Sequence, residues 1–252
     1  NISVTQDPAN FHRCVVSDFF QRINKLFLSE QARGLPIKEF LRRNAANGIS
    51  IGNMVMGMAS ILCSLNGQHY LACWLVFIGY LLDLADGAVA RRLDACSALG
   101  AKLDDFADYT TFGIATSLLL RTPHMVDNVL CMCYGLCVFT RVCFFSSGIP
   151  FVYKGLPCTY SSAIVVSASL LSGGNTMVLR TTAVILILFM IHGSRFYPHD
   201  RVLESQAWKK AVYAGGVLVV FSSIQSVCCV YYLLWGVSYM LFPVSIWKNG
   251  KV

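Results

Sequence analysis

The chain has 252 residues, of which 56% are hydrophobic and only 13% are charged, and its mean hydropathy is +0.58. Soluble domains carry about 25% charged residues, so this composition excludes a disordered chain and argues against a water-soluble globule, which could not bury so much apolar surface. The net charge of +7 comes from basic residues at the ends of apolar runs, a pattern typical of membrane orientation and not of nucleic-acid binding.

An amphipathic segment comes first. In residues 9–30, apolar side chains recur at helical spacing, with basic and polar residues between them. This pattern predicts a helix that lies in the headgroup plane of a membrane; a surface helix packed on protein is the alternative. We expect residues 1–41 to form an N-terminal cytosolic segment that carries this helix. We expect no signal peptide, because the first apolar stretch lacks the charged start, short apolar core and cleavage site of one.

Long apolar runs separated by short polar breaks follow from residue 45 onward. Runs of about 17–25 residues can cross a bilayer, and the expected spans are 45–65, 69–90, 97–120, 126–145, 157–174 and 177–196. Residues 211–247 are too long for one span and are expected to form two helices. We therefore predict an all-α integral membrane domain over residues 42–247 with eight spans; six spans followed by an irregular tail is the alternative.

The basic residues orient these spans. If Arg42 and Arg43 lie in the cytosol, the basic residues that flank the later spans also fall on the cytosolic side, and only Arg121 and Arg180 fall outside. This asymmetry follows the positive-inside rule and predicts a multi-pass protein of that orientation. The sequence does not fix the organelle, although the endoplasmic reticulum is the expected one if the protein is eukaryotic.

The chain contains 11 cysteines, most of them inside apolar runs. In such places cysteine acts as a small hydrophobic residue. Cys131 and Cys133 do not have the CxxC spacing of a zinc site, and no pair of histidines follows them. We therefore expect neither a disulfide framework nor a zinc site.

Four aspartates interrupt the apolar pattern where one expected span ends and the next begins. Asp83 and Asp86 are three residues apart and share a face of one helix, and Asp104 and Asp108 are four apart and share a face of the next. Charges are costly in a membrane, so carboxylates that converge from antiparallel helices need a divalent cation or protons to offset their repulsion. Oxygen ligands without Cys or His suit Mg²⁺ or Mn²⁺. Interhelical salt bridges are the alternative, but few basic residues lie nearby.

Small residues accompany these aspartates. Gly87, Ala90 and Gly100 leave room for a ligand to approach the backbone. Arg91 stands one turn beyond Gly87, and its planar guanidinium suits a phosphate. Together with a cation held by carboxylates, these residues indicate a site for the phosphates of a nucleotide.

The whole pattern, Asp83-x2-Asp86-Gly87-x2-Ala90-Arg91-x8-Gly100-x3-Asp104-x3-Asp108, resembles the signature of the CDP-alcohol phosphatidyltransferases at every position. The resemblance implies a helical membrane core of six spans, often preceded by an interfacial helix. It implies two divalent ions, Mg²⁺ or Mn²⁺, with metal ligands Asp83, Asp86, Asp104 and Asp108, and Asp108 also as the catalytic base. It implies a CDP-binding set of Ser50, Gly87, Ala90, Arg91 and Gly100.

Further stretches resemble the bacterial and archaeal type of phosphatidylserine synthase within this family. They are Asn47–Asn53, Gly100–Gly113, Tyr153–Pro157 and Arg195–Pro198. The resemblance implies transfer of a phosphatidyl group from CDP-diacylglycerol to a small hydroxyl acceptor on the cytosolic side, with release of CMP. Serine is the leading acceptor, with inositol and glycerol 3-phosphate behind it. Membrane lipids and a second copy of the chain, in a homodimer, are the other implied partners.

One stretch departs from that subgroup. Its Arg-x-x-Arg-Phe-Asn run corresponds here to Arg141, with Phe144 in place of the second Arg and Ser146 in place of the Asn. The missing Arg removes a partner for the carboxylate of an amino-acid acceptor. We expect Arg141 and Lys154 in the acceptor or phosphate pocket, with plain positive-inside anchors as the alternative. Two other functions stay open: transfer of a CDP-linked headgroup to diacylglycerol, and a catalytically inactive membrane protein of the same fold.

Overall fold

The computed structural model describes residues 37–145, 152–192, 196–198, 206–222 and 225–247. The amphipathic helix expected in residues 9–30, and Ser146 and Arg195, lie outside these residues. The chain divides into two compact units, 1–44 and 45–252. In the described part of the first unit, Glu39 forms ion pairs with Arg42 and Arg43 at 2.8 and 2.9 Å. The predicted division into residues 1–41 and 42–247 stays a prediction.

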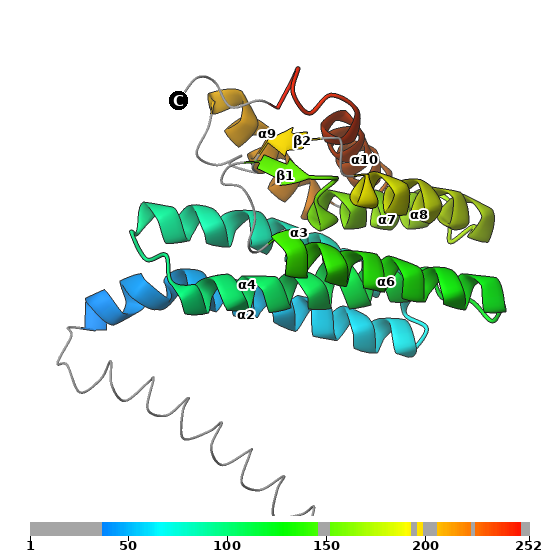
Figure 1. Cartoon of the computed structure of the whole chain (residues 1–252), viewed down its shortest axis with the longest axis horizontal. Coiled ribbons are helices and arrows are strands. Elements are labelled where there is room, and N and C mark those ends of the chain that lie inside the picture. The colour runs from blue at the N-terminus through cyan, green and yellow to red at the C-terminus, as the bar shows by residue number, and fades with distance from the viewer. Residues whose placement is uncertain (1–36, 146–151, 193–195, 199–205, 223–224, 248–252) are drawn as a thin grey trace, which may run out of the picture. The chain divides into compact units, whose positions relative to one another are not determined.

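Helices make up most of the described chain (Figure 1). They are α2 (Ile37–Leu65), α3 (His69–Arg92), α4 (Ala98–Asp108), the π-helix η1 (Tyr109–Ala115), α5 (Thr116–Leu118), α6 (Met125–Phe145), α7 (Cys158–Leu171), α8 (Thr176–Ile191), α9 (Ala207–Val220) and α10 (Gln225–Leu241). Strands β1 (Val152–Lys154) and β2 (Phe196–Pro198) pair antiparallel, with Lys154 opposite Phe196. The sequence analysis expected no such strands.

The outer surface of these helices is apolar and the interior holds polar side chains. Leu62, Leu136 and Leu188 are each more than 60% exposed, whereas Asn53 and Ser161 are fully buried. This arrangement suits a lipid environment, in which apolar side chains face the lipid chains and polar groups must find hydrogen-bond partners inside the protein. It confirms the prediction of an all-α membrane protein.

Three helices in the described part of the chain are long and apolar enough to cross a membrane, over residues 39–65, 69–92 and 125–144. Helices α7, α8 and α10 are apolar but shorter. The 14 residues of α7 rise about 21 Å, less than the roughly 30 Å of a hydrocarbon core. The number of spans therefore stays a prediction.

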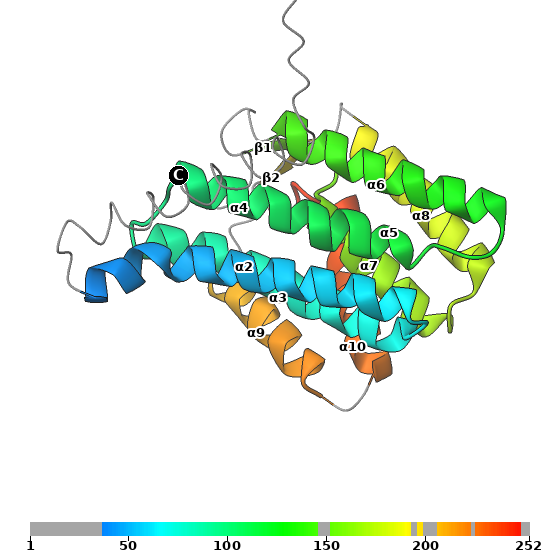
Figure 2. The same ribbon diagram turned by 90° about the horizontal axis from the view of Figure 1, so that it is seen from below.

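The segment expected as a span over 97–120 is an unbroken helical run with a π-helical centre. Helices α4, η1 and α5 follow one another without a gap and lie between α2 and α6 (Figure 2). Within η1, a Cβ on Gly113 would lie 2.7 Å from Cδ2 of Tyr109, so only glycine leaves space for that ring. The π-helix begins directly after Asp108, and such wide turns are frequent at functional sites.

Helix α7 is the centre of the bundle. Its residues from Cys158 to Ser169 are all buried, and α3, α8, α10 and η1 pack around it. Hydroxyl groups inside it bond to backbone carbonyls one turn earlier, as Ser167 does to Ala163 at 2.7 Å. The Tyr134 hydroxyl on α6 lies 3.0 Å from that of Ser161 and links the two helices.

The C-terminal apolar segment forms two helices, as expected. Helix α9 ends at Val220 and α10 begins at Gln225. The break falls where the sequence carries no glycine or proline, and α9 begins at Ala207, ahead of the expected start at residue 211. Lys209 on α9 is buried and donates a 2.9 Å hydrogen bond to the carbonyl of Trp247, which lies beyond the end of α10. This bond connects the end of the segment to α9.

Candidate metal and nucleotide site

Carboxylates from α3 and α4 meet at one point. One oxygen each from Asp83, Asp104 and Asp108 lies within 4.8 Å of the other two. The charges of Asp83 and Asp108 are therefore close enough to repel each other. The structure thus brings together three of the four aspartates that the sequence analysis selected.

Asp86, the fourth aspartate, lies one turn farther along α3, and a residue on α2 holds its side chain. Its side chain is buried, and its Oδ2 accepts a 2.7 Å hydrogen bond from the Ser50 hydroxyl. Its charge interacts with those of Asp104 and Asp108. Ser50, expected to contact the nucleotide, therefore fixes the orientation of a carboxylate next to the trio.

Close packing of α2, α3 and η1 places Asp83 against Asp108. Asn53 on α2 donates a 3.5 Å hydrogen bond to Oδ1 of Asp83, and the Thr111 hydroxyl donates a 3.1 Å bond to the Asn53 carbonyl. A Cβ on Gly57 would lie 2.9 Å from the Thr111 Cα. Glycine at this position is what lets η1 approach α2 so closely.

The space over Gly87 is taken by Arg91. A Cβ on Gly87 would lie 3.1 Å from Nη1 of Arg91, so the guanidinium lies directly over the glycine. The sequence analysis expected open room for a ligand there. The charge of Arg91 interacts with those of Asp86 and Asp104, which puts a phosphate-binding group beside the carboxylates. Ala90 lies on the same turn of α3 and is partly exposed.

Gly100 is also closely approached by polar groups. A Cβ there would lie 2.9 Å from Oδ1 of Asn47 and 3.2 Å from Oγ of Ser97. Ser97 caps the N-terminus of α4 by accepting a 2.9 Å hydrogen bond from the Gly100 amide. This cap fixes the start of the helix that carries Asp104 and Asp108.

Arg141 is buried beside the cluster. Its side chain is only 6% exposed, Nη1 donates a 3.0 Å hydrogen bond to the Gly155 carbonyl, and its charge interacts with that of Asp108. This burial is not typical of a surface anchor, and the assignment of Arg141 to the acceptor or phosphate pocket stays a prediction. Phe144, which stands where the subgroup has its second Arg, is 73% exposed. Lys154 lies on β1, and its side chain is outside the described part.

Cys158 lies at the site although it is not among the residues predicted from the sequence. Its Sγ lies 3.8 Å from Oδ2 of Asp108 at the first turn of α7. Pro157 is the N-cap residue of that helix, and Gly155 before it has a φ of +75°, which glycine adopts without strain. The Gly-Leu-Pro turn was the feature of the sequence that could have indicated Cys158, because the turn positions the residue that follows it.

The donor set fits a divalent ion. Among the described residues, Oδ1 of Asp108 is buried and has no hydrogen-bond partner. Mg²⁺ binds oxygen at about 2.1 Å, so ligands on opposite sides of the ion are about 4.2 Å apart. The three oxygens of the trio all lie within 4.8 Å of one another, which is compatible with ligands that share one ion. The four carboxylates also outnumber the two nearby guanidinium groups.

Comparison with known proteins identifies the family. Residues 43–156 match the family described as CDP-alcohol phosphatidyltransferase. The chain is 33% identical over 129 residues to "CDP-diacylglycerol--serine O-phosphatidyltransferase" of Bacillus subtilis (strain 168), over 72% of that protein and 48% of this chain. The chain belongs to the CDP-alcohol phosphatidyltransferase family. It is a membrane phosphotransferase of this family, whose members are generally dependent on divalent metals and act in phospholipid biosynthesis by phosphatidyl transfer.

Two mammalian relatives extend the similarity beyond this stretch. "Transmembrane protein 269" of Mus musculus is 38% identical over 98% of this chain and 97% of its own length. "Transmembrane protein 269" of Homo sapiens is 43% identical over 78% of this chain and 97% of its own length. The stretch matched by the phosphatidyltransferase family contains all four aspartates and ends just before α7.

Proposed function

We propose that this protein transfers a phosphatidyl group from CDP-diacylglycerol to a small hydroxyl acceptor and releases CMP, with serine as the leading acceptor. The observation that carries the proposal is the convergence of carboxylate oxygens from Asp83, Asp104 and Asp108. Family membership supplies the substrate class, since these enzymes use CDP-alcohols and membrane lipids.

In this proposal the aspartates hold cations and one of them moves a proton. Asp83, Asp86, Asp104 and Asp108 would hold two Mg²⁺ or Mn²⁺ ions, which when bound neutralise charge on the pyrophosphate and the departing CMP. Asp108 takes the proton from the acceptor hydroxyl, and its unpartnered Oδ1 is the available oxygen. The acceptor oxygen then bonds to the phosphorus attached to diacylglycerol, and the bond between that phosphorus and the bridging oxygen of CMP breaks.

The CDP group would lie along the same face of α3 and α4. Arg91 supplies a planar cation for its phosphates from its place over Gly87. Ser50 acts through Asp86, to which it is bonded. Ala90 and Gly100 complete the expected set, and Gly100 marks the capped start of α4, where backbone amides favour negative charge.

Two observations bear on serine as the acceptor. The buried guanidinium of Arg141, close enough to Asp108 for their charges to interact, would be a partner for the carboxylate of an amino acid. Lys154 is the second residue we assign to this pocket. Phe144, which stands where the subgroup has its second Arg, is exposed, whereas Arg141 is buried; this contrast supports Arg141 as the residue of that stretch that contacts the acceptor.

We further propose that the aspartate end of the bundle faces the cytosol, because the basic residues gather on that side by the positive-inside rule. On this assignment, residues 1–41 are cytosolic and residues 42–247 form the membrane domain. A homodimer is the expected assembly by family precedent. The endoplasmic reticulum is the expected membrane in a eukaryote.

The test uses purified protein in detergent with labelled CDP-diacylglycerol, Mn²⁺ and a panel of serine, inositol and glycerol 3-phosphate. We expect release of CMP that depends on one acceptor. A second arm offers diacylglycerol with CDP-linked headgroups, and turnover only in that arm would reverse donor and acceptor. If neither arm releases CMP although the protein binds Mn²⁺, the proposed activity is wrong and the inactive alternative holds.

A further inference from the structure

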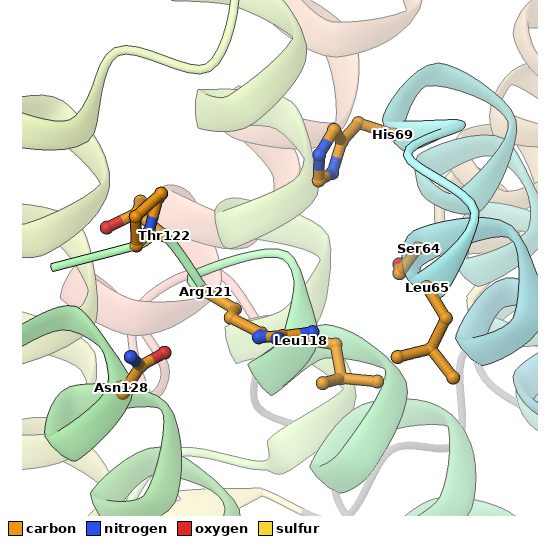
Figure 3. A pocket seen from close by; sticks show the side chains of 8 residues that line it. Ser64, Leu65, His69, Leu118, Arg121, Thr122 and Asn128 are labelled. Atoms are coloured by element: carbon orange, nitrogen blue, oxygen red, sulfur yellow. The ribbon is translucent and has the colours of Figure 1, made fainter. Parts of the chain in front are cut away.

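A pocket of about 450 Å³ lies at the end of the bundle far from the aspartates. It is formed where α2 joins α3 and where α5 joins α6, and its lining is Ser64, Leu65, His69, Leu118, Arg121, Thr122, Pro123 and Asn128 (Figure 3). His69 begins α3 and Asp86 is near its other end, about 25 Å away at 1.5 Å per residue. This pocket is therefore separate from the candidate metal site.

Four polar side chains line this pocket, and within the described part of the chain none of them has a side-chain hydrogen bond or ion pair. Figure 3 shows His69 and Ser64 on one side of the hollow and Arg121 and Asn128 on the other. The Ser64 hydroxyl is buried and has no hydrogen-bond partner in the described part of the chain. A guanidinium, an imidazole, an amide and a hydroxyl that point at one space form a set of donors suited to an anion.

Arg121 differs from the other arginine at this end of the bundle. Nη2 of Arg180 donates a 3.0 Å hydrogen bond to Asp127, and the Thr122 hydroxyl also donates to that carboxylate. Arg180 is thus neutralised by a carboxylate that is itself only 1% exposed. Among the described residues, the ion pairs do not include Arg121. Arg121 is exposed at an end of the bundle where the positive-inside rule predicts few cations, so its charge is available to a ligand that carries negative charge.

The pocket also has an apolar wall. Leu65 and Leu118 line it beside the polar groups, and Leu65 is 57% exposed on the outer surface of the bundle. A ligand with a charged head and apolar chains would place the head among the donors and the chains along these leucines. The volume of the pocket lies within the range of pockets that hold small molecules.

We propose that this pocket binds the phosphate of a glycerophospholipid in the leaflet opposite the aspartates. Arg121 pairs with the phosphate, and His69, Asn128 and Ser64 hydrogen-bond to it or to the glycerol oxygens. The acyl chains leave along Leu65 and Leu118. The protein then carries a lipid site in addition to the site at which lipid is transferred.

Binding of dioctanoyl phosphatidic acid to the purified full chain tests the proposal. The measurement is made in EDTA, which keeps divalent ions away from the aspartates. The comparison ligands are dioctanoylglycerol, which lacks the phosphate, and glycerol 3-phosphate and inorganic phosphate, which lack the chains. We expect phosphatidic acid to bind most tightly, because only it has both parts. If glycerol 3-phosphate or inorganic phosphate binds as tightly as phosphatidic acid or more tightly, the lipid assignment is overturned.

Variants locate the binding. Arg121→Gln should weaken phosphatidic acid binding about ten- to a hundredfold, the range expected for a lost charged hydrogen bond. Asn128→Ala should weaken it a few-fold. Lys210→Gln removes an exposed cation from α9 and should leave binding unchanged. Arg121→Lys keeps the charge without the planar guanidinium and should give an intermediate loss of affinity for phosphatidic acid. This variant replaces Arg121→Gln in the test if Arg121→Gln does not fold. Equal binding by wild type and either Arg121 variant would overturn the proposal.

Discussion

The thiol of Cys158 lies 3.8 Å from Oδ2 of Asp108 and joins the first turn of α7 to the last residue of α4. This contact links the most buried helix of the bundle to the carboxylate that we assign as the base. Because Oδ1 of the same carboxylate has no hydrogen-bond partner among the described residues, the two oxygens differ: one is held by the protein and the other is open to a cation or a proton.

The first prediction concerns the base itself. Asp108→Asn keeps the shape of the side chain but removes the oxygen that accepts the proton, so CMP release should fall about a hundred- to ten-thousandfold. The melting temperature should not fall, because the change also removes one charge from a partly buried group of carboxylates that repel one another. Activity within tenfold of wild type would remove Asp108 from the role of base.

The second prediction concerns the thiol. Cys158→Ala removes the donor to Asp108 and should lower CMP release a few-fold, because a thiol is a weak donor and the hydrogen bond contributes about 1 kcal/mol. Cys158→Ser keeps a donor of similar size and should stay near wild type. Both variants are compared at saturating and limiting Mn²⁺. If the Cys158→Ala and Cys158→Ser variants release CMP at the same rate, the hydrogen bond from Cys158 does not position Asp108.

The third prediction concerns the metal. In substrate-free protein, Mn²⁺ should raise the melting temperature and EDTA should reverse the rise, because an ion that binds only the folded state stabilises it by about 2.7 kcal/mol at a hundred times its Kd. Asp104→Asn should weaken this response, since Asp104 contributes one of the three converging oxygens. Asp94→Asn, at an exposed position between α3 and α4, is the matched control and should respond like wild type.

The spacing of the aspartates was sufficient to predict which carboxylates could meet. Residues three or four apart share a helix face, and a short connection makes neighbouring helices antiparallel, so the sequence predicts that Asp83 and Asp104 lie on facing surfaces. The apolar composition likewise predicted the class of fold, because no soluble arrangement hides that much apolar surface.

Other features depend on contacts between distant residues and could not be predicted from spacing. The π-helix η1 forms where the Tyr109 ring lies over Gly113 and where Thr111 bonds to Asn53, a residue on another helix. The burial of Arg141 depends on the turn at Gly155. The guanidinium of Arg91 fills space over Gly87 that composition alone suggested was open.

The fourth prediction tests this packing. Gly57→Ala would place a Cβ 2.9 Å from the Thr111 Cα, which is backbone and cannot rotate away. The helices must separate, so we expect a loss of about 1–3 kcal/mol in stability and weaker CMP release, because Asn53 and Asp83 shift with them. Gly48→Ala is the control on the same helix, where a Cβ would meet nothing within 4 Å. It should be neutral or stabilise by up to about 1 kcal/mol, since alanine favours a helix over glycine. Melting temperatures of the two variants in the same detergent decide the matter: equal effects would mean that close approach of η1 to α2 does not depend on Gly57.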